Sequence, residues 1–468
     1  MIPSGRQPNR REILSRAGGG LAALALAVME GKTEARASYS SSRPTHFTAT
    51  AKNVIWVFID GGPSHVDLFD PKPKINTLAG QPLPPSFKRP VTAMGKTAYS
   101  GLLPSKRKFK QHGQSGMWIS DWLPSLAKCA DHLTMLKGCW ADGLNHVGSV
   151  CQMNTGSVLG GRPCLGSWAA YGLGSECDNL PAFVVLQDYP EEPPGGGRNW
   201  STGFMPSLYQ GTRFREGKSP VLHLAPGNPD PRIQKHLLDY LRQVNRQHLE
   251  KRQEDLDLQA RLESYELAYR MQAAAPEAVD LAGETAATHA LYGTADAKTE
   301  RMGRNCLMAR RLVERGVRFV QIYCGSGSKW DAHTDVEANH GRYCAESDRP
   351  VAALILDLKQ RGLLDSTLVI WGGEFGRTPM SESGNGRDHN PFGFSMWMAG
   401  GGVKPGMVHG ATDELGLYAI EGKAHVHDVH ATILHLLGMN HIKLTYHYGG
   451  RDERLTINDG HVIEPILA

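Results

Sequence analysis

The stretch VIWVFIDGGP at residues 54–63 decides the fold class of this 468-residue chain. Its first six residues are apolar and rich in β-branched and aromatic side chains, which is typical of a strand buried on both faces. Such strands occur in parallel sheets that helices cover on both sides. The run ends on Asp60, followed by two glycines. Open α/β sheets build their sites at the carboxyl ends of such strands, so we expect Asp60 to lie in one.

Three later segments repeat this pattern of an apolar strand next to polar, chemically useful residues. The strands are predicted at 317–323, 367–371 and 394–398, and helix-like segments at 299–315 and 351–358 precede the first two. The alternation of helices and strands predicts a mostly parallel sheet with helices on both faces, which is a three-layer α/β fold. A charged, strongly helical stretch from residue 229 to about 290 predicts an inserted helical hairpin, with an apolar stripe at Leu237, Leu238, Leu241 and Val244.

The amino terminus has the three parts of a signal peptide. Adjacent arginines at Arg10 and Arg11 precede a weakly hydrophobic, Gly/Ala-rich core and a small-x-small cleavage motif at residues 35–37. These features predict a twin-arginine signal over residues 1–37 and a mature protein of residues 38–468, exported by the twin-arginine translocase to the periplasm or the medium. An ordinary secretory signal or an uncleaved anchor is the alternative.

Charge and hydropathy exclude several classes of protein. The net charge is +4, and residues 1–37 contribute six Lys/Arg against three Glu, so the mature chain is close to neutral. A neutral surface gives no electrostatic reason to expect nucleic acid as a partner. No stretch after the signal approaches the ~18 apolar residues that a membrane span needs. The eight cysteines form no Cys-x-x-Cys pair, which argues against a zinc ribbon and leaves disulfide pairing open.

Acids and histidines gather at the ends of the predicted strands. They are Asp60, Asp331, His333, Glu374 and His389. A parallel sheet brings such positions to one edge, and an Asp/Glu/His set without cysteine suits one or two divalent ions of the zinc or manganese kind. Two such ions about 4 Å apart clamp and polarise a phosphate or sulfate ester.

Five motifs resemble those of a known bacterial family. They are DGGPSH at residues 60–65, NH at 145–146, WDAH at 330–333, GGEFGRTP at 372–379 and DH at 388–389. With these motifs the mature chain resembles, over nearly its whole length, the family called domain of unknown function 1501, which is similar to the alkaline phosphatase and sulfatase superfamily. The resemblance implies an alkaline-phosphatase-like fold over residues 38–468 and metal-dependent hydrolysis of phosphate or sulfate esters.

The resemblance also implies roles for individual residues. Asp60 would be the metal ligand of the first strand, Asp331 and His333 would hold an ion, and His389 would be the last histidine ligand. The superfamily's Asp-His pair appears here as Glu374-Phe375, so the acid is kept as Glu374 and the histidine is lost.

His146 occupies the position at which such enzymes carry a Ser, Thr or modified Cys nucleophile at the start of a helix. A histidine there has three possible roles: it replaces the missing metal ligand, it acts as a general acid or base, or it marks a site without catalysis. We favour the ligand role, with direct attack by metal-bound hydroxide.

Arg377 follows the loop that carries Glu374 and has two interpretations. It offers a bidentate fork to a phosphate or sulfate, or it forms a structural ion pair. His65 and His340 are secondary candidates, because a histidine in a loop is more often a hydrogen-bonded structural residue than a ligand. The sequence thus predicts an exported metallohydrolase of small-molecule or polysaccharide esters. The alternative is a metal-stabilised envelope protein that binds a polysaccharide or a protein without turnover.

Overall fold

The computed structural model describes residues 43–215, 219–224, 231–250, 256–457 and 459–468. The expected twin-arginine signal at residues 1–37 lies outside the described residues.

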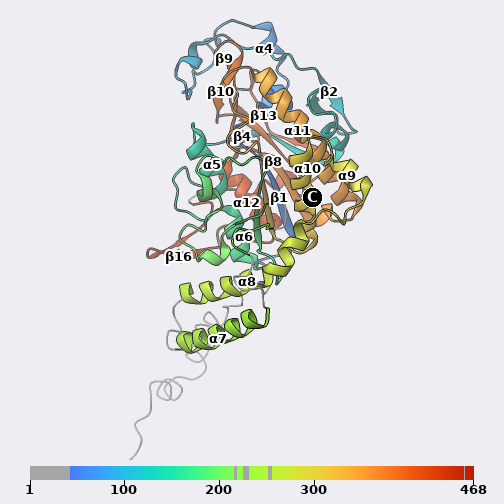
Figure 1. The fold of residues 1–468 in the computed structure, drawn as a ribbon. Helices are drawn as coiled ribbons and strands as arrows, with labels where there is room; N and C mark the ends of the chain where they lie inside the picture. The colour runs from blue at the N-terminus through green and yellow to red at the C-terminus, as the bar shows by residue number, and fades with distance from the viewer. Residues whose placement is uncertain (1–42, 216–218, 225–230, 251–255, 458) are drawn as a thin grey trace, which may run out of the picture.

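A central sheet organises the described part of the chain (Figure 1). Its nine strands lie in the order β12-β4-β11-β8-β1-β7-β5-β6, and β15 also pairs with β4. The strands are β1 (Asn53–Ile59), β4 (Leu133–Trp140), β5 (Phe183–Gln187), β6 (Thr212–Arg213), β7 (Phe319–Cys324), β8 (Thr367–Gly372), β11 (Phe394–Ala399), β12 (Met407–His409) and β15 (Ala424–His425). Among these nine, β11 alone runs against the others, because it pairs antiparallel with both β8 and β4. The prediction of a mostly parallel sheet is confirmed.

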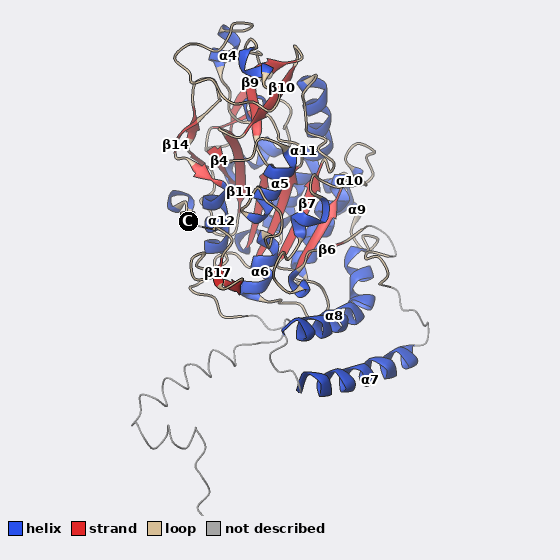
Figure 2. Cartoon of the chain, turned by 90° about the vertical axis from the view of Figure 1, so that its left-hand side faces the viewer, coloured by secondary structure: helices blue, strands red, loops and turns tan. Residues whose placement is uncertain are grey.

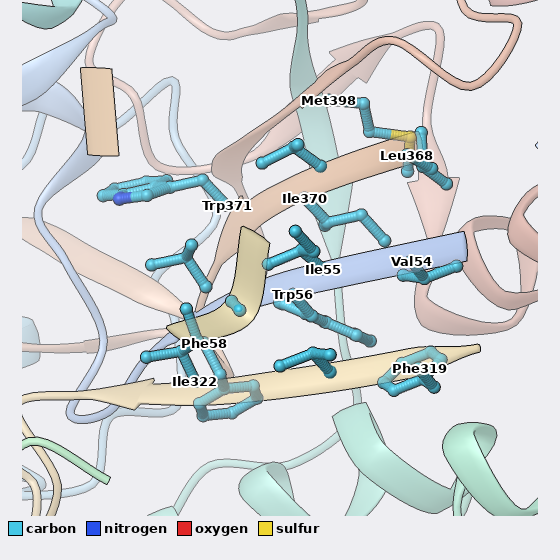
Figure 3. Packing of buried hydrophobic residues seen from close by; sticks show 14 of the residues in the cluster. Val54, Ile55, Trp56, Phe58, Phe319, Ile322, Leu368, Ile370, Trp371 and Met398 are labelled. Carbon is cyan, nitrogen blue, oxygen red and sulfur yellow. The ribbon is translucent and has the colours of Figure 1, made fainter. Parts of the chain in front are cut away.

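The sheet is the centre of the hydrophobic core because its middle strands are buried on both faces. Every residue of β1 is buried, and the strand lies between β7 and β8, with Ile55 opposite Val320 and Val369. Figure 3 shows buried side chains of these three strands and Met398 of β11 packed close together. Removing such surface from water stabilises the fold by about 25 cal/mol per Å².

Helices cover both faces of the sheet, as Figures 1 and 2 show. On one side lie α9 (Ala286–Tyr292), α10 (Glu300–Glu314) and α11 (Val336–Gln360), and on the other lie α5 (His146–Thr155), α6 (Leu165–Leu173) and α12 (Val426–Leu436). The predicted three-layer α/β architecture is confirmed. Helix α10 ends at Glu314, and Gly316 follows with a φ of +86°, the left-handed conformation that glycine adopts readily after a helix.

The predicted helical insertion consists of α7 (Pro231–Glu250) and α8 (Leu256–Val279), with α9 following. The two long helices lie side by side beyond one end of the sheet (Figure 2). Gln234 hydrogen-bonds Gln272 at 2.9 Å across the pair. Much of the predicted apolar stripe of α7 remains accessible, since Leu237, Leu241 and Val244 are each more than 40% exposed.

Shorter elements lie at the rim of the fold. They are α3 (His65–Leu68), α4 (Pro73–Thr77), and the two-stranded pairs β2 (Phe109–His112) with β3 (Met117–Ser120), β9 (Gly376–Glu382) with β10 (Gly386–Asn390), β13 (Ala411–Thr412) with β14 (Ala419–Glu421), and β16 (Tyr446–Tyr448) with β17 (Arg451–Glu453). No helix within the described segments has the length and apolar character to cross a bilayer. All eight cysteines fall in described segments, and each has a free thiol.

Candidate metal centre

The sheet topology explains how the predicted site residues reach one edge. Asp60 follows β1, Asp331 lies in the loop after β7, and Glu374 lies just beyond β8. These three strands are parallel, so their carboxyl ends lie together. His389 on β10 precedes β11, and because β11 is antiparallel its beginning lies at the same edge. Helix α5 begins at His146, the position at which the sequence predicts the start of a helix.

Four of the predicted ligands converge on one point. The candidate ligand atoms of His146, Asp331, His333 and His389 all lie within 4.8 Å of one another. The Asp331 carboxylate is the hub: its Oδ2 lies 3.2 Å from Nε2 of His146, and its Oδ1 lies 3.1 Å from Nε2 of His333 and 3.4 Å from Nε2 of His389. Ligands about 2.1 Å from a tetrahedral zinc ion lie about 3.4 Å apart, so these separations match the edges of such a polyhedron.

Each of the three histidines is oriented through its other ring nitrogen. Nδ1 of His146 lies 2.7 Å from Oε1 of Glu374, and Nδ1 of His333 lies 2.5 Å from Oε2 of Glu382. Nδ1 of His389 lies 2.9 Å from the carbonyl oxygen of Leu144. All three partners accept hydrogen bonds, so we assign the proton to Nδ1 in each ring, which leaves the Nε2 lone pair facing Asp331. This arrangement is the one by which proteins orient histidine ligands of metals.

Electrostatics at the centre follows from this packing. Burial alone would lower the pKa of His146, but the adjacent carboxylates of Asp331 and Glu374 raise it to about 9. Burial works against ionisation of Asp331, yet the three histidines and Arg377 hold its pKa well below the usual range. Burial lowers the pKa of His389. The pKa of His333 is raised, first by Asp331. In the absence of an ion the carboxylates therefore favour protons on His146 and His333 but not on His389, and a divalent cation competes with these protons.

Asp60 and Glu374 lie behind His146 rather than in the four-residue group. Both side chains are fully buried. Oδ2 of Asp60 accepts hydrogen bonds from the backbone N–H groups of Gly327 and Ser328 at 2.8 and 2.9 Å, and Glu374 accepts one from Gly61 at 3.1 Å. Burial and the nearby charge of Glu374 raise the pKa of Asp60 well above its usual value.

Two observations indicate that these residues suit a bound cation. In and beside the centre, three buried polar atoms have no hydrogen-bond partner among the described residues: Oδ1 of Asp60, Nε2 of His146 and Nε2 of His389. The 3.2 and 3.4 Å approaches of the two histidines to Asp331 are thus contacts without hydrogen-bond alignment. Carboxylates also outnumber cationic side chains here, and they belong to Asp60, Asp331, Glu374, Glu382 and Asp388. A divalent ion at the four-residue group would satisfy the two histidine nitrogens and offset the negative charge.

Arg377 is fully buried, and its hydrogen bonds are made within the protein. Its guanidinium donates to the carbonyl oxygens of Gly61, Gly62 and Arg387, and Nη2 lies 2.7 Å from Oδ1 of Asp331. Of the two interpretations open from the sequence, the geometry favours the structural ion pair over contact with a substrate. Arg377 orients Asp331 through this ion pair. Its guanidinium is engaged inside the protein, where a bidentate contact with a phosphate or sulfate was the other interpretation.

Several residues of the centre were not identified from the sequence. Glu382 holds His333 from the end of β9, and a second group of candidate ligand atoms joins His333, Glu382 and Asp388 within 4.8 Å. Phe375 takes the place of the missing histidine in the motif and stacks on the ring of His389, with centroids 4.3 Å apart. No local sequence pattern marks Glu382 as part of the site, because its position depends on the pairing of β9 with β10.

The two secondary candidates have structural roles. Nε2 of His65 lies 2.8 Å from the carbonyl oxygen of Gly416. Nε2 of His340 accepts a hydrogen bond from the backbone N–H of Ser64 at 2.8 Å, and burial lowers the pKa of His340 to about 3. Neither residue belongs to the groups of candidate metal ligands found among the described residues.

The buried His340 is expected to make the fold sensitive to acid. Its pKa is about 3 in the folded state and about 6.5 when unfolded. The unfolded chain therefore binds the extra proton between these values, and stability is full above pH 6.5 and falls as the pH is lowered toward 3. The loss between pH 7 and pH 5 attributable to this residue is about 2 kcal/mol.

Urea unfolding of wild type and His340→Gln at pH 7 and pH 5 measures this contribution. We expect the variant to lose about 2 kcal/mol less than wild type on acidification. Equal losses in the two proteins would contradict the assignment.

Gly61 is expected to be essential to the geometry of Asp331. Its φ is +120°, and an added Cβ would lie 2.5 Å from the backbone nitrogen of Asp331. Gly61→Ala should destabilise the fold by about 2 kcal/mol or more and weaken metal binding, because the loop that carries Asp331 must move. Gly80→Ala is the matched control, since Gly80 also has positive φ, of +74°, but nothing within 4 Å. The control should lose about 1 kcal/mol and bind metal normally; equal metal affinity in the two variants would contradict the argument.

A three-layer α/β fold with three histidines and one aspartate at the carboxyl edge of its sheet defines the class of protein: an α/β protein with a candidate divalent-metal centre. The particular family follows from its sequence. Residues 51–467 match the model of the family described as Protein of unknown function (DUF1501), and the chain belongs to that family. No curated protein matches the chain.

The chain also shows distant similarity to solved structures. One is the lipoteichoic acid synthase LtaP from Listeria monocytogenes, with 10% identity and a TM-score of 0.38 over 91% of this chain and 79% of that chain. Another is a magnesium-bound mutant of TAB5 alkaline phosphatase, with 12% identity and a TM-score of 0.36 over 84% and 99%. A third is a sulfatase from Pseudoalteromonas sp., with 12% identity and a TM-score of 0.33 over 89% and 70%.

Proposed function

We propose that this protein is an exported, metal-dependent hydrolase of phosphate or sulfate esters. One observation carries the proposal: the Nε2 atoms of three histidines converge on Asp331 while each Nδ1 is held by an acceptor. That arrangement is expected of metal ligands and is costly without an ion, because it leaves buried nitrogens without partners.

The ion would be held by His146, Asp331, His333 and His389. Nitrogen and carboxylate ligands without thiolate suit zinc or manganese. When bound, a divalent ion supplies a Lewis acid that polarises the ester and lowers the pKa of water. A second ion beside Asp60 and Glu374, as the sequence suggests, stays a prediction.

The surrounding residues orient an anionic ester. The side chains of Asp331, His333 and His146 are 25%, 23% and 16% exposed, so the centre can be reached from solvent on their side. Helix α5 begins at His146, and Asn145 caps it by accepting from Gly148 at 3.0 Å. The positive end of the helix dipole favours a sulfate or phosphate at this point.

The geometry supports the ligand role of His146 over that of general acid or base. Nδ1 is engaged by Glu374 and Nε2 faces Asp331, so neither nitrogen is directed at an incoming substrate. With an imidazole at this position there is no hydroxyl to form a covalent ester intermediate. Direct attack by water on the ester is the simplest reaction for this set of residues.

The proposal includes export of the protein from the cytoplasm. The arginine pair and apolar core of residues 1–37 favour the twin-arginine translocase as a partner, with the mature protein in the periplasm or the medium. The substrate class is a small-molecule or polysaccharide ester. Nucleic acid is not proposed, since the mature chain is nearly neutral.

An ester-hydrolysis screen tests the proposal. Zinc- or manganese-loaded protein is assayed with aryl phosphate monoesters, phosphodiesters and sulfate esters, beside His389→Ala and the matched control His447→Ala. His447 is an exposed histidine on β16, with 70% of its side chain accessible. We expect turnover in wild type and the control and a loss of about 100-fold or more in His389→Ala. Metal binding without turnover of any ester would favour the alternative, a metal-stabilised envelope protein that binds a polysaccharide or protein partner.

A further inference from the structure

A cavity of about 460 Å³ lies at the carboxyl ends of β5 and β6, at the same edge of the sheet as the metal centre. Gln187 and Asp188 come from the end of β5, and Arg213 and Arg215 come from β6 and the residues after it. Arg301 and Asn305 of α10 close the third side. None of these residues belongs to the candidate metal centre.

The lining is predominantly cationic. The charged residues that line the cavity are three arginines and one aspartate. Arg213 and Arg215 both line the cavity. Burial and the like charge of Arg215 lower the pKa of Arg213. Arg213 pairs at 3.2 Å with Glu192, an exposed residue, and Arg301 lies over the ring of Tyr189 at 4.8 Å. Clustered guanidinium groups of this kind match the oxygens of sulfate and phosphate.

Asn305 supplies a second, independent observation. Its side chain is 5% exposed, and its Nδ2 atom is buried without a hydrogen-bond partner among the described residues. A buried donor left unpaired costs about 1–3 kcal/mol, which an acceptor oxygen in the cavity would recover. Arg301 and Asn305 are four residues apart at the start of α10, so both lie on one face near the positive end of its dipole.

The one carboxylate in the lining accepts hydrogen bonds from the backbone. Asp188 accepts hydrogen bonds from the backbone N–H groups of Gly325 and Ser326 at 2.7 and 3.0 Å. The next two residues of this loop, Gly327 and Ser328, bind Asp60. The same loop reaches Asp331 of the metal centre three residues after Ser328. Six residue steps span at most about 22 Å, so one short loop joins the cavity to the centre.

We propose that this cavity binds a second sulfate or phosphate group of a polyanionic substrate whose first ester lies at the metal centre. The inference rests on the proposed function and narrows the substrate class from a simple ester to a molecule with several anionic groups, such as a sulfated or phosphorylated glycan. Arg213, Arg301 and Asn305 are the specificity-determining residues.

The first test measures anion binding alone. Inorganic sulfate and inorganic phosphate are titrated calorimetrically into protein carrying His389→Ala, so that the metal centre does not contribute. Against that background we compare Arg213→Gln/Arg301→Gln with Arg213→Lys/Arg301→Lys and with Arg242→Gln/Arg451→Gln. The last removes the same charge at two exposed arginines, one on α7 and one on β17.

We expect the Gln pair at the cavity to weaken binding at least tenfold, the Lys pair to weaken it less because the charge is kept, and the remote pair to stay within about threefold. Equal affinity in the cavity and remote Gln variants would overturn the proposal, and so would an absence of binding in the parent protein. This titration does not depend on catalysis, so it shows whether the cavity binds an anion even if no ester is hydrolysed.

The second test compares substrates in otherwise unmodified, metal-loaded protein. The ratio of kcat/KM for a polysulfated or polyphosphorylated oligosaccharide to that for an aryl monoester should fall at least tenfold in Arg213→Gln/Arg301→Gln, chiefly through KM. The remote pair should leave the ratio unchanged. Turnover of both substrates with an unaltered ratio in the cavity variant would contradict the polyanionic substrate while leaving the metallohydrolase intact.

Discussion

Replacement of Asp331 with asparagine is expected to lower the affinity of the centre for zinc or manganese by more than about 100-fold. The Asp331 carboxylate contacts His146, His333 and His389 and pairs with the buried Arg377. Asparagine keeps the shape of the side chain but removes its charge, so the cation loses its central anionic ligand. Arg377 then remains buried without its carboxylate partner, which adds a cost in stability.

Competition with a metal indicator measures this loss, and two variants bracket it. Glu382→Gln alters only the orientation of His333 and should cost about 10- to 100-fold. Asp365→Asn, at a residue whose side chain is 85% exposed, should cost nothing. Binding by Asp331→Asn as tight as that of Asp365→Asn would exclude Asp331 as a ligand.

The second large effect is expected at the buried ion pair beneath the β9–β10 ribbon. Nε of Arg387 lies 2.8 Å from Oδ2 of Asp67, and both side chains are at most 1% exposed. The Ser64 hydroxyl donates to the same oxygen at 2.6 Å. Asp67→Asn should destabilise the protein by about 3–5 kcal/mol, because it leaves the Arg387 charge buried without compensation. The ribbon carries His389 and Glu382, so metal affinity should fall as well.

Urea unfolding measures this destabilisation, with Asp239→Asn as the control. Asp239 pairs with Arg242 at 3.1 Å on α7, where both side chains are more than 40% exposed. An exposed pair contributes about 0–1 kcal/mol, so the control should be close to wild type. Similar stabilities for the two variants would show that the Asp67–Arg387 pair does not hold the ribbon.

Much of the fold could be predicted because its central strands have an unmistakable composition. The apolar runs of β1 and β8 are buried on both faces, so their residues are apolar without alternation. Strand β4 was not predicted, because Lys137 and Gly138 interrupt its apolar pattern. The antiparallel direction of β11 was also beyond the sequence, since direction depends on its pairing with β4 and β8.

The candidate ligands could be predicted from the sequence, but the contacts around them could not. Motif and strand position led to His146, Asp331, His333 and His389, and the structure brings these four together. Spacing alone could not show that Glu374 reaches Nδ1 of His146 instead of the common centre. Nor could it show that the guanidinium of Arg377 is used internally. Both facts depend on side-chain directions that only the packed loops determine.

Elemental analysis of the purified protein after zinc or manganese loading and dialysis measures whether the centre holds a metal. We predict about one tightly bound equivalent at the His146, Asp331, His333 and His389 group. That equivalent should disappear in His389→Ala while His447→Ala retains it. A wild-type protein that remains folded and metal-free after loading would contradict metal binding at this group. The histidine–aspartate cluster would then be a structural hydrogen-bond network.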